Sequence, residues 1–215
     1  MIQESFKETH HPVSWRYKAG IAVSVATFLG FIFCVHPFLA LNSPVSADTL
    51  IVEGWVPDYV LARAAQEFKG GHYTRIFVSG IFSDASQSAQ KTNIDGTDAV
   101  RQLVGLGISA SVIEACPTAS ASFNRTSHMA RSVRDRMRAL GVIPGGVNVF
   151  TLGPHARQSV LAYQRMLGGL SPVGVISIPK YDYNPSRWWA SGAGIKKTTK
   201  DFAGWLKELI FGLRS

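Results

Sequence analysis

The chain has 215 residues, which is enough for one ordinary domain with an appendage and too few for two full domains. Apolar residues make up 46% of the sequence and charged residues 17%, a composition that excludes a disordered chain and a coiled coil. The formal net charge of +8 favours an anionic partner, such as nucleic acid, a membrane surface or an anionic small molecule. Two cysteines, Cys34 and Cys116, cannot form a disulfide framework or a metal cluster.

Residues 19–41 form an apolar stretch without Asp, Glu, Lys or Arg. As a helix, about 23 residues would reach roughly 35 Å, enough to cross a hydrocarbon core of about 30 Å. A buried core helix is the alternative, but such a helix rarely lacks a polar stripe over this length. The sequence therefore predicts a transmembrane helix over residues 19–41, between a tail at residues 1–18 and a linker at residues 42–47.

Charged residues around this stretch predict its orientation. Lys7, Arg16 and Lys18 precede it, and the next Lys or Arg along the chain is Arg63. The positive-inside rule then places the N-terminus in the cytoplasm and the C-terminal part on the other side of the membrane. Residues 45–47, Val-Ser-Ala, resemble a signal-peptide cleavage site, but the apolar stretch is longer than the apolar core of a typical signal peptide, which has roughly 7–15 residues. An uncleaved signal anchor is favoured, and cleavage is the alternative.

Short apolar runs alternate with segments of helical spacing through the rest of the chain. Strands are predicted at residues 49–53, 75–79, 111–115, 147–152 and 173–178. Helices are predicted at residues 56–69, 95–106, 124–140, 155–167 and 193–213, with a serine-rich loop at residues 83–93. This alternation predicts one Rossmann-like, three-layer α/β domain over residues 48–215, with a mostly parallel five-stranded sheet between two layers of helices.

Several chemistries lack their motifs in this sequence. It has no G-x-x-x-x-G-K-[ST] phosphate loop, no G-x-S-x-G nucleophile elbow and no H-E-x-x-H. Residues 105–110 match G-x-G-x-x-A, but they follow a predicted helix, whereas the dinucleotide-binding motif follows a strand and opens a helix. A glycine that ends the helix is the better interpretation. No two histidines have metal-ligand spacing, so no metal site is predicted, and the cofactor is left open.

In an open α/β sheet, ligands bind outside the carboxyl ends of the strands, near the point where the strand order reverses. The residues predicted at that edge include two candidates for acid–base catalysis, Glu53 and His155. The candidates for ligand binding are Gly54, Ser79, Gly80, Glu114, Asn124 and Arg157, with Ser122 beside them.

Each candidate has both a functional and a structural interpretation. His155 and Arg157 follow Gly-Pro at a predicted helix start, where backbone N–H groups favour an anion. Instead, His155 could cap or pack a helix, and Arg157 could form a surface ion pair. Glu53 ends an apolar strand, where a carboxylate is costly unless it is paired or functional. Ser79 and its neighbouring glycine could form a tight turn, and Asn124 could be an N-cap.

Two groups of basic residues remain. Arg131, Arg134 and Arg138 share one face of a predicted helix and most simply form a solvated face. The C-terminal helix has an apolar stripe flanked by lysines; packing onto the sheet is the default, and contact with anionic lipid is the alternative.

Motifs along the chain add a resemblance. They are residues 48–54, 75–80, 112–114, 122–124 and 153–157, with Arg63 and the pair Trp188 and Trp189. In this order they resemble the YdcF-like family, over roughly residues 48–209. The resemblance implies a Rossmann-like fold, an N-terminal anchor and a role in cell-envelope or surface-polysaccharide biogenesis, but no particular reaction. Ser127 and Asp201 stand where the family usually has Glu, which implies that a family ligand is bound differently here.

These observations favour a single-pass membrane protein whose outer domain binds an anionic lipid-linked or sugar-phosphate ligand. Membrane lipid is a predicted partner, and envelope-assembly proteins are possible partners. The alternatives are a hydrolase or transferase that acts on such a ligand, with Glu53 or His155 as acid or base, and a nucleotide-like cofactor binder. Nucleic acid is not predicted as a partner, because an extracytoplasmic domain seldom meets it.

Overall fold

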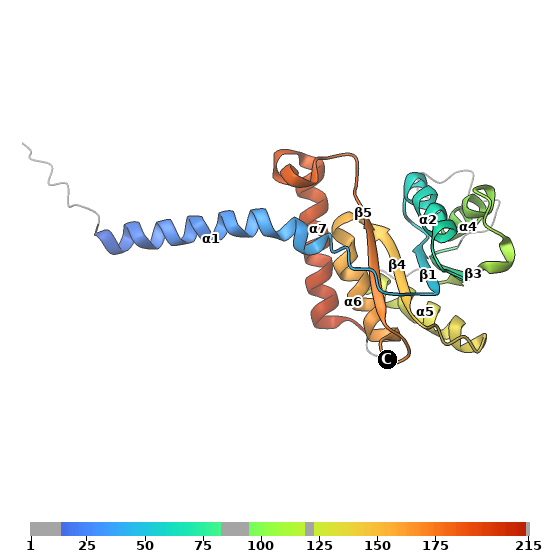
Figure 1. Cartoon of the computed structure of the whole chain (residues 1–215). Coiled ribbons are helices and arrows are strands. Elements are labelled where there is room, and N and C mark those ends of the chain that lie inside the picture. The colour runs from blue at the N-terminus through green and yellow to red at the C-terminus, as the bar shows by residue number, and fades with distance from the viewer. Residues whose placement is uncertain (1–13, 83–94, 119–122, 214–215) are drawn as a thin grey trace, which may run out of the picture. The chain divides into compact units, whose positions relative to one another are not determined.

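The computed structural model describes residues 14–82, 95–118 and 123–213 (Figure 1). The serine-rich loop at residues 83–93, Ser122 and most of the N-terminal tail lie outside the described residues. The chain divides into two compact units, Met1–Cys34 and Val35–Ser215, and each is described by itself.

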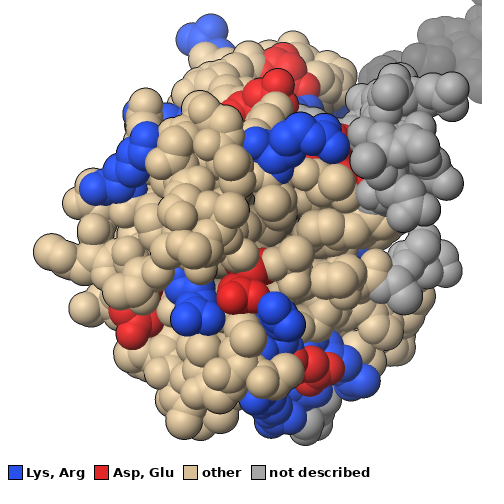
Figure 2. Space-filling model, turned by 90° about the vertical axis from the view of Figure 1, so that its right-hand side faces the viewer, with Lys and Arg blue, Asp and Glu red and all other residues tan. Residues whose placement is uncertain are grey.

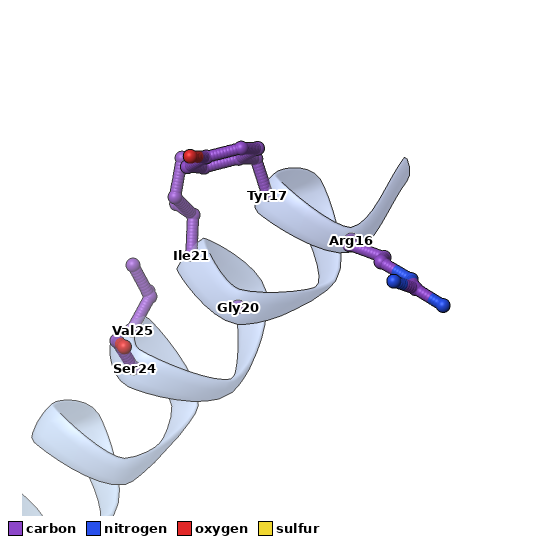
Figure 3. Close-up of a pocket in the computed structure, with 6 residues that line it drawn as sticks. All are labelled: Arg16, Tyr17, Gly20, Ile21, Ser24 and Val25. Carbon is purple, nitrogen blue, oxygen red and sulfur yellow. The ribbon is translucent and has the colours of Figure 1, made fainter. Parts of the chain in front are cut away.

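The first unit is most of one long apolar helix, α1 (Trp15–Leu39), which begins earlier than predicted and ends two residues sooner. Its 25 residues reach about 37 Å, and only 11% of its most apolar window is buried, so it is long and apolar enough to cross a membrane. Figure 3 shows a hollow beside Gly20 whose lining side chains, including Tyr17 and Ile21, all belong to α1. Because one exposed helix forms it, this hollow is no enclosed binding site.

The second unit is built on a sheet of five parallel strands, which confirms the predicted α/β class. The strands are β1 (Thr49–Glu53), β2 (Arg75–Gly80), β3 (Ile113–Pro117), β4 (Val147–Leu152) and β5 (Val173–Ile178). Their order is β3-β2-β1-β4-β5. Every residue of β1 and β4 is buried, as expected for central strands that are covered on both faces and read as continuous apolar runs.

Helices cover both faces of the sheet (Figure 1). One face packs on α2 (Asp58–Gly70) and α4 (Gly96–Gly105) through a core that includes Leu50, Val52 and Leu61. The other face packs on α5 (Arg125–Ala139) and α6 (Ala156–Leu167) through Ile51, Phe77 and other buried residues. The C-terminal helix α7 (Gly192–Phe211) contacts α6 and the short 3₁₀ turns η2 (Gly153–His155) and η3 (Pro185–Ala190).

The third strand lies two residues later than predicted. Ala110–Val112 forms the 3₁₀ turn η1, because the Ser109 hydroxyl accepts a hydrogen bond from the N–H of Ser111 and caps the turn. The strand therefore begins at Ile113, and Glu114 is its second residue instead of its end.

The last turn of α1 is part of the second compact unit, Val35–Ser215. Val35, His36 and Leu39 are buried. The Arg157 guanidinium lies 3.9 Å from the centre of the Phe38 ring and donates a hydrogen bond to the Phe38 carbonyl. Residues 42–47, predicted as a linker, also contact the sheet. The side chain of Asn148 on β4 accepts a hydrogen bond from the N–H of Val45 and donates one to its carbonyl.

Candidate functional site

The strand order reverses between β1 and β4. From β1 the chain moves outward through β2 to β3, and β4 then returns to the other side of β1. Glu53 is the last residue of β1, and η2 follows β4 directly, so both lie at this switch point. Open α/β sheets bind their ligands there.

Glu53 is fully buried and has hydroxyl groups around its carboxylate. The hydroxyl of Thr151 donates to its Oε2, and the hydroxyl of Ser159 donates to its Oε1 at 2.8 Å. The carboxyl oxygens accept both bonds, which provide the partners that a buried polar group needs.

His155 lies between two carboxylates. Its Nε2 is 4.0 Å from Oε2 of Glu53, and its Nδ1 is 3.4 Å from Oδ1 of Asp201. The edge of its ring meets Trp55, with ring centres 5.0 Å apart. The side chain retains 15% of its exposure, so it stands at the boundary between the buried Glu53 and solvent.

Asp201 comes from the middle of α7 and is paired on its other oxygen. Lys197, one helical turn earlier, places Nζ 2.9 Å from Oδ2 of Asp201 and 5.5 Å from the centre of the Trp55 ring. Burial alone would raise the pKa of Asp201, but the hydrogen bond and charge of His155, together with Lys197, lower it below its usual value. We call Glu53, Trp55, His155, Lys197 and Asp201 the edge cluster.

The charges of the edge cluster determine what it can do chemically. The carboxyl groups of Glu53 and Asp201 lie on either side of His155, and Lys197 pairs with Asp201. Because Asp201 holds Nδ1, the group left to exchange a proton with a ligand is Nε2. A histidine in this setting can bind an anion or act as an acid or base.

A second polar pair lies in the core behind the cluster. Ser79 pairs with Glu53 in the β1–β2 register, and its hydroxyl lies 2.7 Å from that of Tyr163 on α6. Burial and the charge of Glu53 raise the pKa of Tyr163, so this phenol stays neutral. Ser79 and Tyr163 are both fully buried, so Ser79 lies beneath the edge cluster and is not exposed to a ligand.

Gly54 and Gly80 allow the turn after β1 to approach the start of α4. A Cβ on Gly54 would lie 2.8 Å from Cα of Gly96, and the N–H of Gly54 donates to the carbonyl of Ser79 at 2.7 Å. At Gly80 a Cβ would have its nearest neighbour at 3.7 Å. Both glycines border the edge cluster through backbone packing.

Three predicted ligand-binding residues have other partners in the structure. Glu114 pairs with Arg75 and Arg136, 3.4 Å and 2.7 Å away, on the edge strand β3. Asn124 adopts a left-handed conformation with φ of 50°, and its side-chain amide donates to the carbonyl of Phe211. Arg157 is bound to Phe38, as described above. The structure thus brings together Glu53 and His155, and directs these three side chains elsewhere.

Trp55, Lys197 and Asp201 are the members of the cluster that were not among the predicted site residues, although the family resemblance had singled out the position of Asp201. Lys197 and Asp201 come from α7. Their i, i+4 spacing was visible as a helical ion pair, but the same spacing occurs on many solvated helices. Which side of α7 faces η2 depends on tertiary packing, and no local pattern indicates it.

Basic side chains are interspersed with acidic ones on the face shown in Figure 2, which views the molecule from the right-hand side of Figure 1.

No family model matches the chain, and no curated protein matches it.

Proposed function

We propose that this chain is a single-pass membrane protein of the YdcF-like family whose α/β domain lies outside the bacterial cytoplasmic membrane. In this proposal the edge cluster binds an anionic lipid-linked or sugar-phosphate ligand used in cell-envelope or surface-polysaccharide biogenesis. The observation that carries it is the pair of partly exposed basic side chains, His155 and Lys197, at the switch point of the sheet.

Carboxylates hold both basic groups in place. Asp201 contacts both of them, and its side chain is only 4% exposed, so the basic groups keep their positions without a ligand. A phosphate oxygen would accept hydrogen bonds from Nε2 of His155 and Nζ of Lys197, which each keep 15% of their exposure.

The position of the domain at a membrane surface suggests the class of ligand. A helix that can cross a membrane precedes it, and a domain held at a membrane surface meets lipid-linked intermediates at high effective concentration. Trp55, in ring contact with His155, adds an apolar surface for a sugar or the start of a lipid chain. The resemblance of the sequence motifs to envelope proteins supports the same class.

A second candidate function is catalysis on such a ligand, and one observation favours it. Asp201 orients His155 through Nδ1 while Nε2 points toward Glu53, which is the arrangement of a general acid or base held by a carboxylate. In a hydrolase or transferase, Nε2 would give a proton to the leaving group or take one from the attacking water or hydroxyl.

The test is a binding titration with the full chain in detergent micelles. The probes are a long-chain polyprenyl phosphate and glucose 1-phosphate, each followed by calorimetry and by release of inorganic phosphate. His155→Ala is expected to weaken binding by roughly 10- to 100-fold, because a hydrogen bond to a charged group is worth about 1.5–3 kcal/mol. The matched control is His128→Ala on α5, which should bind as the wild type does.

The outcomes separate the two functions. Binding without phosphate release supports the binder, and release that is lost in His155→Ala supports the enzyme. Equal binding by the wild type and His155→Ala, or no binding of either probe, would overturn the proposal.

A further inference from the structure

The helix α7 has a large exposed apolar surface on the side turned away from the edge cluster. Ile195, Leu206, Leu209, Ile210 and Phe211 are between 40% and 59% exposed. With Phe202, the first three follow a spacing of i, i+7, i+11 and i+14, which places them on one stripe of the helix. Contiguous exposed apolar side chains on a domain surface are the usual composition of an interaction site.

The charges on α7 are distributed unevenly around its axis. Its two acidic residues, Asp201 and Glu208, are 3% and 0% exposed and are paired with basic side chains. Lys196, Lys200 and Lys207 follow the spacing i, i+4 and i+11, so they line one side of the apolar stripe. The outer surface of α7 is therefore apolar and positively charged, with no acidic side chain among them.

Chain connectivity brings this helix close to the end of the apolar helix α1. Phe38 packs edge-on against Trp205 of α7, with ring centres 5.0 Å apart. It lies four residues beyond Cys34, the last residue of the first unit, and four residues of helix span about 6 Å. If the helix crosses the bilayer up to Cys34 with Arg16 and Lys18 at the cytoplasmic surface, residues 15–34 reach about 30 Å, and the middle of α7 is held near the opposite lipid surface.

We propose that α7 lies on the membrane surface, with its stripe of Ile195, Phe202, Leu206 and Leu209 in the headgroup region and Lys196, Lys200 and Lys207 bound to anionic lipid headgroups. The combination of an apolar stripe and a lysine flank is typical of helices that lie in the membrane interface. The opposite side of the same helix holds Lys197 and Asp201, so α7 would place the edge cluster directly beside the lipid surface. This inference does not depend on which ligand the edge cluster binds.

The test places a fluorescent label on α7 in the full chain, reconstituted into vesicles. Cys34 is replaced by serine, and burial raises the pKa of the Cys116 thiol to about 12, so an introduced cysteine is the reactive one. The label is attached at Leu206→Cys or Ile210→Cys. The control is Val104→Cys on α4, where the native side chain is 41% exposed compared with 40% for Leu206.

Quenching by lipids that carry a nitroxide reports lipid contact. In phosphatidylcholine vesicles with added phosphatidylglycerol, labels at 206 and 210 should be quenched and the label at 104 should not. Replacing Lys196, Lys200 and Lys207 with glutamine should lower the contact equilibrium roughly 100-fold, since each surface lysine contributes about 1 kcal/mol. Replacing Lys69, Arg101 and Arg138 with glutamine removes the same charge elsewhere and should leave the quenching unchanged.

Three results would overturn the proposal. One is a label at 206 that remains as accessible to water as the label at 104. Another is quenching that is independent of phosphatidylglycerol or falls equally in both triple variants. The third is shielding of the label only in vesicles with many copies of the chain, which would assign the stripe to a contact between two copies.

Discussion

Asp201 is a buried carboxylate whose pKa is nonetheless lowered. Burial acts to raise the pKa, and His155 and Lys197 outweigh it. A carboxyl whose pKa is lower in the folded state stabilises the fold above its ordinary value of 3.8 and loses this contribution as the pH falls below it. Asp201→Asn should therefore lower the free energy of unfolding at pH 7 by about 1–3 kcal/mol, and the deficit should shrink below pH 3.8.

Thermal unfolding of the full chain in detergent at pH 7 and pH 3 measures this difference. Asp135→Asn is the control, because Asp135 is 55% exposed in its ion pair with Arg134 and such pairs contribute little. An Asp201→Asn deficit of the same size at both pH values would contradict the charge assignment in the edge cluster.

Thr151 holds the buried carboxylate of Glu53 with its hydroxyl. Thr151→Val keeps the shape of the side chain but removes the donor, so Glu53 retains Ser159 and the more distant His155. We expect a loss of about 1.5–3 kcal/mol in the free energy of unfolding, the value of a hydrogen bond to a charged group. Urea unfolding measures it, and Thr74→Val, at an exposed hydroxyl, should change the stability by less than about 0.5 kcal/mol. Equal effects would mean that Glu53 is not held as an ionised acceptor.

At the level of the elements, the turn between β1 and α2 lies close to the start of α4. Substitutions at Gly54 and Gly80, which are close in space, test this contact. Gly54→Ala would place Cβ 2.8 Å from Cα of Gly96 and 3.2 Å from the carbonyl oxygen of Ser79, and both are backbone atoms. The elements must shift, at an expected cost of about 1–3 kcal/mol. Gly80→Ala, with its nearest neighbour at 3.7 Å, should cost clearly less.

Thermal unfolding of the two glycine variants decides the point. If Gly80→Ala proved as destabilising as Gly54→Ala, the packing of the β1–α2 turn against α4 would not be the tight contact described above.

Sequence patterns predicted the strands best where both boundaries carry a physical signal. β1, β4 and β5 have the predicted bounds, because each is a largely apolar run; β4 and β5 also follow Gly or Pro. The bounds of β3 were wrong because the Ser109 cap competes with strand formation at residues 110–112. That two-residue shift also moved Glu114 away from the end of its strand.

The candidate site was predictable only in part, for a related reason. Glu53 ends β1 and His155 lies in the turn directly after the neighbouring strand β4, so topology alone brings them together. The partners of the other side chains come from distant segments: Asp201 and Lys197 from α7, and Phe38, which binds Arg157, from the last turn of α1. Such contacts depend on how the helices are rotated and docked, and the local spacing of residues in the sequence does not determine either.

At the scale of the whole molecule, the orientation of α1 is a prediction from Arg16 and Lys18. Alkaline phosphatase, which folds to an active enzyme only outside the cytoplasm, should be active when fused after residue 213. A fluorescent protein that matures only in the cytoplasm should be dark at the same position. Replacing Arg16 and Lys18 with glutamate and adding two lysines at residues 42–47 should reverse both signals in a substantial fraction of the molecules. The opposite result for the unaltered chain would place the domain in the cytoplasm.

We propose that the edge cluster binds a phosphate-bearing envelope ligand, and this binding can be tested on the protein purified from membranes. Its most direct test is the identity of the small molecules that remain bound to the full chain purified from membranes, measured by mass spectrometry of the extracted ligands. The wild type and His128→Ala are predicted to carry the same phosphate-containing lipid or sugar, and His155→Ala is predicted to carry little or none. An identical set of bound molecules in all three, or a wild type with no phosphate-containing ligand, would contradict the claim.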